Sequence, residues 1–87
     1  MKELLALIPE TKRKLLLFLC EHRHDDKLRT LLHISQEARM AYVTTKKVLR
    51  EFESLGLVKI YVVGRGRARV VVPTEELKDL CAKLQDA

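Results

Sequence analysis

The stretch that decides the fold is VLREFESLGLVKIYVVGRGRARVVVP, which runs from Val48 to Pro73. Its first part has the pattern of a helix, because Val48, Phe52 and Leu55 recur at spacings of three and four residues and so share one face. Gly56 stands where a glycine commonly ends a helix. Two runs of β-branched residues around a glycine-rich turn follow, and this pattern predicts a β-hairpin. We therefore expect a helix that leads directly into two antiparallel strands.

The hairpin, with strands expected at 57–63 and 67–72 and a turn at 64–66, is strongly basic. Arg65, Arg67 and Arg69 lie at its turn and on the returning strand, where strand alternation should place Arg67 and Arg69 on one face. Between Arg39 and Arg69 the chain has eight basic and two acidic residues, whereas the remainder has nine basic and ten acidic. The net charge of +5 therefore arises in one contiguous third of the chain. Such asymmetry favours a polyanionic partner.

Upstream of this stretch the sequence predicts further helices. Residues 10–22 have an amphipathic pattern preceded by Pro9, a residue that suits the first turn of a helix. The segment LRTLLHI, residues 28–34, fits either a short strand or a helical turn. Ser35 is a candidate N-cap for a short helix at QEARMA, and Thr44 is a candidate N-cap for the longer helix that reaches residue 55.

Both ends of the chain add apolar residues beyond what a small core needs. The N-terminal group suits a short helix, and Thr74 is a candidate N-cap for a last helix with a clear apolar stripe. These residues either enlarge the core or form a two-fold dimer interface, and we favour the interface. The two groups consist of Leu4, Leu5, Leu7, Ile8, Leu77, Leu80, Cys81 and Leu84.

Length and composition exclude several classes of protein. Eighty-seven residues suit one domain, and the longest apolar run, Leu15 to Cys20, is far too short to span a membrane. The start of the chain lacks a signal-peptide pattern, so a cytoplasmic location is expected. No nucleophile–base arrangement or phosphate-binding loop is present, so neither an enzyme nor a cofactor is expected. The absence of Asn and Trp beside many charged residues is a thermophile-like bias.

Cysteine and histidine residues raise the question of a metal site. Cys20, His22 and His24, with His33 and Cys81 as further ligands, match no standard zinc spacing. Cys20 also lies in an apolar helical run, where a cysteine usually packs as a small hydrophobe. We therefore expect no metal.

The segment ISQEARMAYVTTKKVLREFESLGLVKI, residues 34–60, resembles the helix-turn-helix of winged-helix transcription regulators. The nearest are those of the multiple-antibiotic-resistance (MarR) and arsenical-resistance (ArsR) types and their archaeal relatives. The matching features are Ala38, Val43 before a Thr-Thr pair, and VLREFESLGLV running into a hairpin. PETKRKLLLFL resembles the opening helix, so the resemblance covers residues 9–73. Tyr42 stands where the family often has glycine in the turn, and Glu37 where it commonly has leucine.

The resemblance implies an α+β fold: a winged helix-turn-helix with a three-helix core, a two-stranded β-hairpin wing and an additional C-terminal helix. Residues 1–87 would form a single domain, with the core at 9–73, the wing at 57–73 and flanking helical segments at 1–8 and 74–87. In this fold the first and last helices can approach each other. The possibility of a Cys20–Cys81 disulfide therefore stays open, although cytosolic disulfides are rare except in hyperthermophiles.

The resemblance also implies sequence-specific binding of double-stranded DNA by a homodimeric transcription regulator. The recognition helix, 44–55, would enter the major groove, and the wing, 64–69, would contact the backbone or minor groove. Because Val48, Phe52 and Leu55 should face the core, residues 45, 46, 47 and 50 should face outward. Arginine can pair with guanine edges, and threonine can contact a thymine methyl or a phosphate. The candidate DNA-binding residues are Thr44, Thr45, Lys46, Lys47, Arg50, Arg65, Arg67 and Arg69.

Other interpretations of the same residues remain open. The helix face could be solvated, with Glu51 and Glu53 balancing its lysines, and the wing arginines could protect an edge strand from aggregation. The basic run at residues 12–14 could touch the DNA backbone or lie in a solvated turn. The alternative function is a winged-helix protein-interaction module in a nucleic-acid-handling assembly, supported by Glu37 and Tyr42. RNA binding ranks lower, because the chain has few aromatic residues for base stacking.

Overall fold

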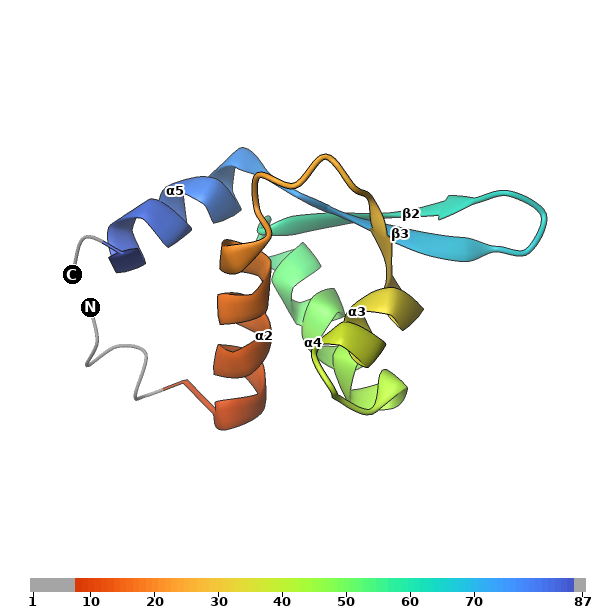
Figure 1. The fold of residues 1–87 in the computed structure, drawn as a ribbon, viewed down its shortest axis with the longest axis horizontal. Helices are drawn as coiled ribbons and strands as arrows, with labels where there is room; N and C mark the ends of the chain where they lie inside the picture. The colour runs from red at the N-terminus through yellow and green to blue at the C-terminus, as the bar shows by residue number, and fades with distance from the viewer. Residues whose placement is uncertain (1–7, 86–87) are drawn as a thin grey trace.

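The computed structural model describes residues 8–85, and it confirms the expected winged helix-turn-helix (Figure 1). Helices α2, α3 and α4 cluster on one side of a small sheet, the hairpin extends beyond them, and α5 lies at the opposite end (Figure 1). The helix expected at Leu4, Leu5 and Leu7 falls outside the described residues. The elements are α2 (Glu10–Glu21), β1 (Arg29–Thr30), α3 (Leu31–Glu37), α4 (Tyr42–Ser54), β2 (Val58–Val63), β3 (Ala68–Pro73) and α5 (Glu75–Gln85).

The sheet has a third strand in addition to the expected hairpin. Its order is β1-β3-β2 with antiparallel pairing throughout, and the hairpin register places Val63 opposite Ala68 next to the tip. The third strand is Arg29–Thr30, which pairs with β3. The ambiguous segment at residues 28–34 therefore contains both elements, a short strand and then a helix from Leu31 onward.

Helix α3 begins earlier than expected, because Thr30 caps it instead of Ser35. The Thr30 hydroxyl accepts a hydrogen bond from the His33 N–H at 3.1 Å, which satisfies one of the donors that a helix start leaves open. Ser35 lies within the helix, buried, and its hydroxyl donates to the Leu32 carbonyl at 2.7 Å. The prediction of Ser35 as an N-cap is wrong, because its side chain serves a carbonyl inside the helix instead.

The turn between α3 and α4 is closed by an arginine in the left-handed conformation. Arg39 has φ of 55°; its N–H donates to the Gln36 carbonyl at 3.2 Å, and the Met40 N–H donates to the Ser35 carbonyl at 2.9 Å. This is the helix ending in which glycine is usual. Tyr42, the residue expected in this turn, is instead the first residue of α4. The backbone position in this turn that favours glycine is therefore Arg39.

Helix α4 also differs from the expected range at both ends. It starts after Ala41, which makes no side-chain capping bond, so the prediction of Thr44 as an N-cap is wrong. Its end at Gly56 is confirmed, because this glycine has φ of 78° and its N–H donates to the Glu53 carbonyl at 3.0 Å. Leu55 was expected to face the core but is 69% exposed, because it lies just past the last turn of the helix.

Thr74 joins the end of the sheet to the end of α4. Its hydroxyl lies 2.6 Å from the Gly56 carbonyl oxygen and 2.9 Å from that of Leu57. The same oxygen accepts a hydrogen bond from the Leu77 N–H at 3.3 Å, so the prediction of Thr74 as the N-cap of the last helix is confirmed. Helix α5 thus begins at a fixed point beside the hairpin.

The core lies where the helices meet the inner face of the sheet. Buried apolar side chains from α2, α3 and α4 face one another, and β2 and β3 each add a buried valine. Burial of such side chains contributes about 1.5–3 kcal/mol each. The largest fully buried side chains are Leu15, Leu31, Ile34, Leu49, Leu77, Val58, Thr45 and Cys81.

Helix α5 belongs to this core through a disulfide. Cys20 of α2 and Cys81 are bonded, with an S–S distance of 2.12 Å and Cα atoms 5.4 Å apart. Leu77 and Cys81 are fully buried within the chain, whereas Leu80 and Leu84 are partly buried against the same core. Of the two roles considered for this apolar stripe, its inner part therefore enlarges the core. The dimer stays a prediction.

Candidate nucleic-acid interface

Helix α4 has a buried side and an exposed side. Its buried residues are Thr45, Val48, Leu49 and Phe52. Residues on the opposite side follow one another at spacings of four, three and four, which aligns them in a row along the helix. The exposed row consists of Val43, Lys47, Arg50 and Ser54.

The position of Thr45 corrects the sequence analysis. This residue is fully buried, and its hydroxyl donates to the Ala41 carbonyl at 2.9 Å. The prediction that it faces outward is wrong, because it lies three residues before Val48 and four before Leu49 and so shares their side of the helix. The bond to a carbonyl four residues back satisfies the hydroxyl, so a polar residue can occupy the core. Thr44 is partly exposed.

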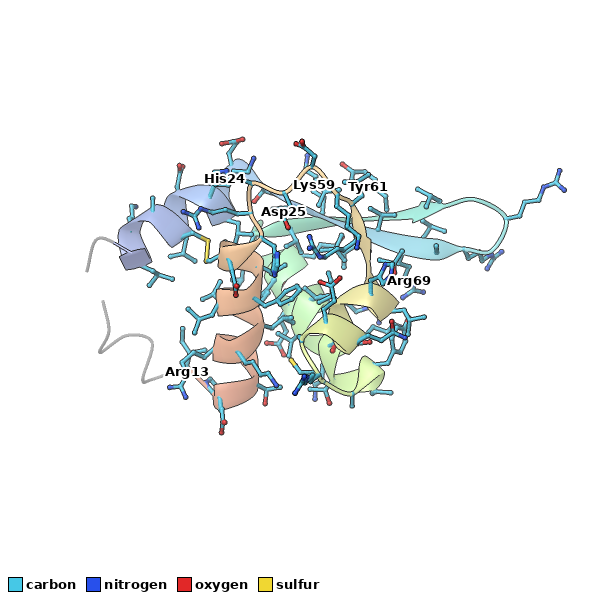
Figure 2. All side chains as sticks on the ribbon, viewed as in Figure 1. Arg13, His24, Asp25, Lys59, Tyr61 and Arg69 are labelled. Atoms are coloured by element: carbon cyan, nitrogen blue, oxygen red, sulfur yellow. A yellow bond between two sulfur atoms is a disulfide. The ribbon has the colours of Figure 1, made fainter. Side chains whose placement is uncertain are left out.

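A basic residue of the wing lies near basic residues of α4. Arg69 pairs with Val62 across the hairpin, and Figure 2 shows it on the side of the sheet where α3 and α4 lie. The positive charges of Arg69 and, next, Arg50 lower the pKa of Lys46, so both arginines lie within effective Coulomb range of Lys46. Lys46, Lys47 and Arg50 also line one shallow hollow on α4. We call Lys46, Lys47, Arg50 and Arg69 the cationic surface.

The acidic residues of α4 do not neutralise this surface. Glu51 forms an ion pair with Lys12 of α2, and the Glu53 carboxylate accepts the Ile60 N–H at 3.1 Å. Within residues 8–85, none of the six basic residues predicted to bind DNA takes part in an ion pair. Both carboxylates therefore have partners outside the cationic surface, although Glu51 also lines the hollow of Lys46, Lys47 and Arg50. Lys12 serves a contact between helices.

The tip of the wing is a loop at residues 64–67 that projects beyond the helices (Figure 1). Gly64 and Arg67 have φ of 71° and 53°. The prediction that Arg67 and Arg69 share a strand face is wrong, because Arg67 lies in the turn and not on β3. Arg65 and Arg67 are exposed at this tip, away from α4. Arg13 lies on α2, at the far end of that helix from Arg69 (Figure 2).

A polar cluster that the sequence analysis did not find connects the wing to the helix-turn-helix. Arg29 of β1 donates from Nε to Glu37 Oε2 at 2.9 Å and from Nη2 to Asp25 Oδ2 at 3.0 Å, and its side chain is only 13% exposed. The hydrogen bond from Arg29 lowers the pKa of Glu37, and bonds from His22 and Arg29 lower the pKa of Asp25. Because β1 pairs with β3, this cluster fixes α3 relative to the strand that carries Arg69.

The only sequence signal for this cluster was Glu37 in place of the usual leucine. Its partner Arg29 lies eight residues upstream, across a strand–helix junction whose nature the pattern left undecided. Glu37 therefore has a partner inside the chain, and it no longer supports a protein-interaction module.

The residues considered for a metal site have other partners. Cys20 is in the disulfide, and His22 Nδ1 lies 2.9 Å from Asp25 Oδ2. Among the described residues, no group of three or more His, Cys, Asp and Glu residues could hold a metal ion. In the same part of the chain, every helix is too short or too polar to cross a membrane.

Several solved structures share this fold. A proposed DNA-binding protein from Ralstonia eutropha superimposes with a TM-score of 0.76 at 23% identity, over 88% of this chain and 96% of that one. The protein AF1382 of Archaeoglobus fulgidus superimposes with a TM-score of 0.78 at 12% identity, over 93% of this chain and 87% of AF1382. MepR of Staphylococcus aureus, solved in complex with DNA, superimposes with a TM-score of 0.73 at 21% identity, over 91% of this chain and 63% of MepR.

A MarR family regulator from Neisseria meningitidis also matches, with a TM-score of 0.69 at 21% identity, over 93% of this chain and 55% of the regulator. No protein-family model and no curated protein matches the sequence. These neighbours include a proposed DNA-binding protein, a MarR family regulator and a protein solved in complex with DNA. The chain therefore has the winged-helix fold of MarR-family transcription regulators.

Proposed function

We propose that this protein is a transcription regulator that binds double-stranded DNA in a sequence-specific manner, as a homodimer in the cytoplasm. The observation that carries the proposal is the cationic surface. Lys46, Arg50 and Arg69 come together although they repel one another, and no acidic residue among residues 8–85 pairs with them. A polyanion would relieve this repulsion. The fold is shared with MepR, which has been solved in complex with DNA.

In the proposed complex, α4 lies in the major groove. A B-DNA major groove is about 12 Å wide and admits one helix. Lys47 and Arg50 lie on the exposed row of α4, opposite its buried side. An arginine can donate two hydrogen bonds to the edge of a guanine, whereas a lysine acts more as a point charge on phosphate. Arg50 is therefore the candidate for base readout.

The wing adds contacts to the backbone or the minor groove. Arg69 lies on β3 on the side of the sheet where α4 lies, and Arg65 and Arg67 lie at the tip of the hairpin. Arginine side chains are attracted by the enhanced negative potential of a narrow minor groove. Each phosphate that they neutralise should add about 0.9 to the slope of log affinity against log salt concentration.

Two variants with a matched control test this assignment. Duplexes selected from a random pool are titrated at several salt concentrations. Arg50→Ala should change the preference among sequences, whereas Arg67→Ala should weaken binding to all of them and reduce the salt slope by about 0.9. Arg13→Ala, at the far end of α2 from Arg69, should leave both properties unchanged. If both Arg50→Ala and Arg67→Ala bind every duplex with the affinity of the wild type, the assignment is refuted.

The homodimer is tested separately by the mass of the protein in solution. A two-fold dimer places its recognition helices about 34 Å apart, the spacing of half-sites one helical turn apart. Because Leu77 and Cys81 are buried in the core of the chain, the interface must use other residues of the terminal segments. We expect a mass twice the 10.1 kDa of the chain in light scattering. A monomer in both free and DNA-bound states would contradict the dimer.

The protein-interaction module remains as the alternative outcome of the titration. Tyr42, which is 42% exposed at the start of α4, is the residue that still supports it. A chain that binds no duplex at moderate salt would favour this alternative over a regulator.

A further inference from the structure

Val43 is the most exposed of the large apolar side chains in residues 8–85, at 77%. It is the second residue of α4, where a β-branched side chain is less favourable than alanine. Its exposure shows that the packing of the chain does not require it. An apolar group held in solvent beside lysines and arginines is therefore a candidate for contact with a partner.

The position of Val43 connects it to the proposed DNA-binding surface. It precedes Lys47 by four residues and Arg50 by seven, so all three lie on the exposed row of α4. Val43 also lines the same hollow as Lys46, Lys47 and Arg50. In helix-turn-helix proteins the N-terminal residues of the recognition helix are those that reach base edges. Because α4 begins at Tyr42, Val43 belongs to that first turn.

We propose that Val43 determines specificity by packing against the C5-methyl group of a thymine in the major groove. This inference rests on the proposed function and names one base that the site reads. Valine has no hydrogen-bonding side-chain atom, so it gains little from a phosphate or from a guanine edge. The thymine methyl is the apolar group that the major groove presents. Lys47 and Arg50, farther along the row, supply the polar contacts.

The test removes the methyl group and nothing else from the DNA. Each thymine of a selected duplex is replaced in turn by deoxyuridine, and affinity is measured by the fluorescence anisotropy of the labelled duplex at fixed salt. The wild type should bind about fourfold more weakly when the contacted thymine of a half-site is replaced, which corresponds to one buried methyl group. Val43→Ala should bind the thymine and deoxyuridine forms equally.

Leu55→Ala is the matched control, because it removes another exposed apolar side chain, 69% exposed, at the opposite end of α4. This variant should keep the deoxyuridine sensitivity of the wild type. Val43→Ala should fold as well as the wild type, because the residue is exposed and alanine favours a helix, and its urea midpoint checks this.

The outcomes separate the inference from the function on which it rests. If the wild type binds DNA but is insensitive to deoxyuridine at every position, the inference is overturned and DNA binding stands. The same conclusion holds if Val43→Ala keeps the full sensitivity of the wild type. If the wild type binds no duplex at all, the proposed function is overturned together with this inference.

Discussion

Reduction of the Cys20–Cys81 disulfide should greatly destabilise the protein without altering the cationic surface. The bond joins α2 to α5 across a sequence separation of 61 residues and closes most of the chain into a loop. The closed loop lowers the conformational entropy of the unfolded state, and reduction of the disulfide restores that entropy. Helix α5 and the wing lie at opposite ends of the fold (Figure 1), so the bond is remote from the wing.

The size of the effect follows from the length of the loop. The chain-entropy relation gives about 4 kcal/mol for a loop of this length. Both cysteine residues are buried, and the reduced thiols can still pack as small hydrophobes, so little is lost from the folded state. A domain of this size is expected to have a total stability of roughly 4–13 kcal/mol. The disulfide therefore accounts for a large share of it.

Urea denaturation with and without a reductant measures this effect. With an m-value of about 1 kcal/mol/M, the midpoint of the reduced protein should fall by about 4 M. Alkylation and mass spectrometry should find two thiols only after reduction. The double variant Cys20→Ala, Cys81→Ala serves as the control, because its midpoint should not respond to the reductant. A shift below about 1 M in the wild type would refute the reasoning.

Three further substitutions test individual features of the fold. Arg39→Gly should raise the free energy of unfolding by about 1 kcal/mol in urea denaturation, because glycine adopts the φ of 55° without steric cost; an unchanged stability would contradict this. Glu37→Gln should destabilise the protein near neutral pH but hardly at a pH well below the lowered pKa of Glu37. Arg29 lowers the pKa of Glu37 below its ordinary 4.5, so the carboxylate stabilises the fold above that value and loses this contribution as the pH falls through the lowered pKa. Denaturation at both pH values checks this, and an equal effect at both would argue against it. Thr45→Val should leave DNA affinity unchanged in a titration and cost under about 1 kcal/mol, because the Ala41 carbonyl keeps its bond from the Thr45 N–H. A loss of affinity by the folded variant would instead support an outward-facing Thr45.

The parts of the fold that the sequence predicted are those with local signals. The hairpin follows from β-branched runs around a glycine-rich turn, and the end of α4 follows from Gly56, whose positive φ favours glycine. Thr74 was identified as a cap because it directly precedes a clear apolar stripe. In each case the residues that decide the structure are neighbours in the chain.

The errors arose where one residue type has two local uses. Ser35 and Thr45 were taken for a cap and for an exposed contact, but both hydroxyls bond to carbonyls inside their own helices. Thr30, the actual cap of α3, lay in a segment whose pattern fitted both strand and helix. The Arg29–Glu37 pair was not predicted, because it depends on how β1 meets α3 and no spacing rule describes that junction.

The distribution of charges in the fold distinguishes structural residues from those kept for a partner. Acidic residues are placed where they stabilise the chain, with Glu37 on Arg29 and Glu51 on Lys12. Lys46 of the cationic surface lies close enough to Arg69 and Arg50 for their like charges to lower its pKa. Glu51 is on the same helix as this surface, yet it pairs with α2. This separation of charges supports the proposal that the cationic surface binds a polyanion.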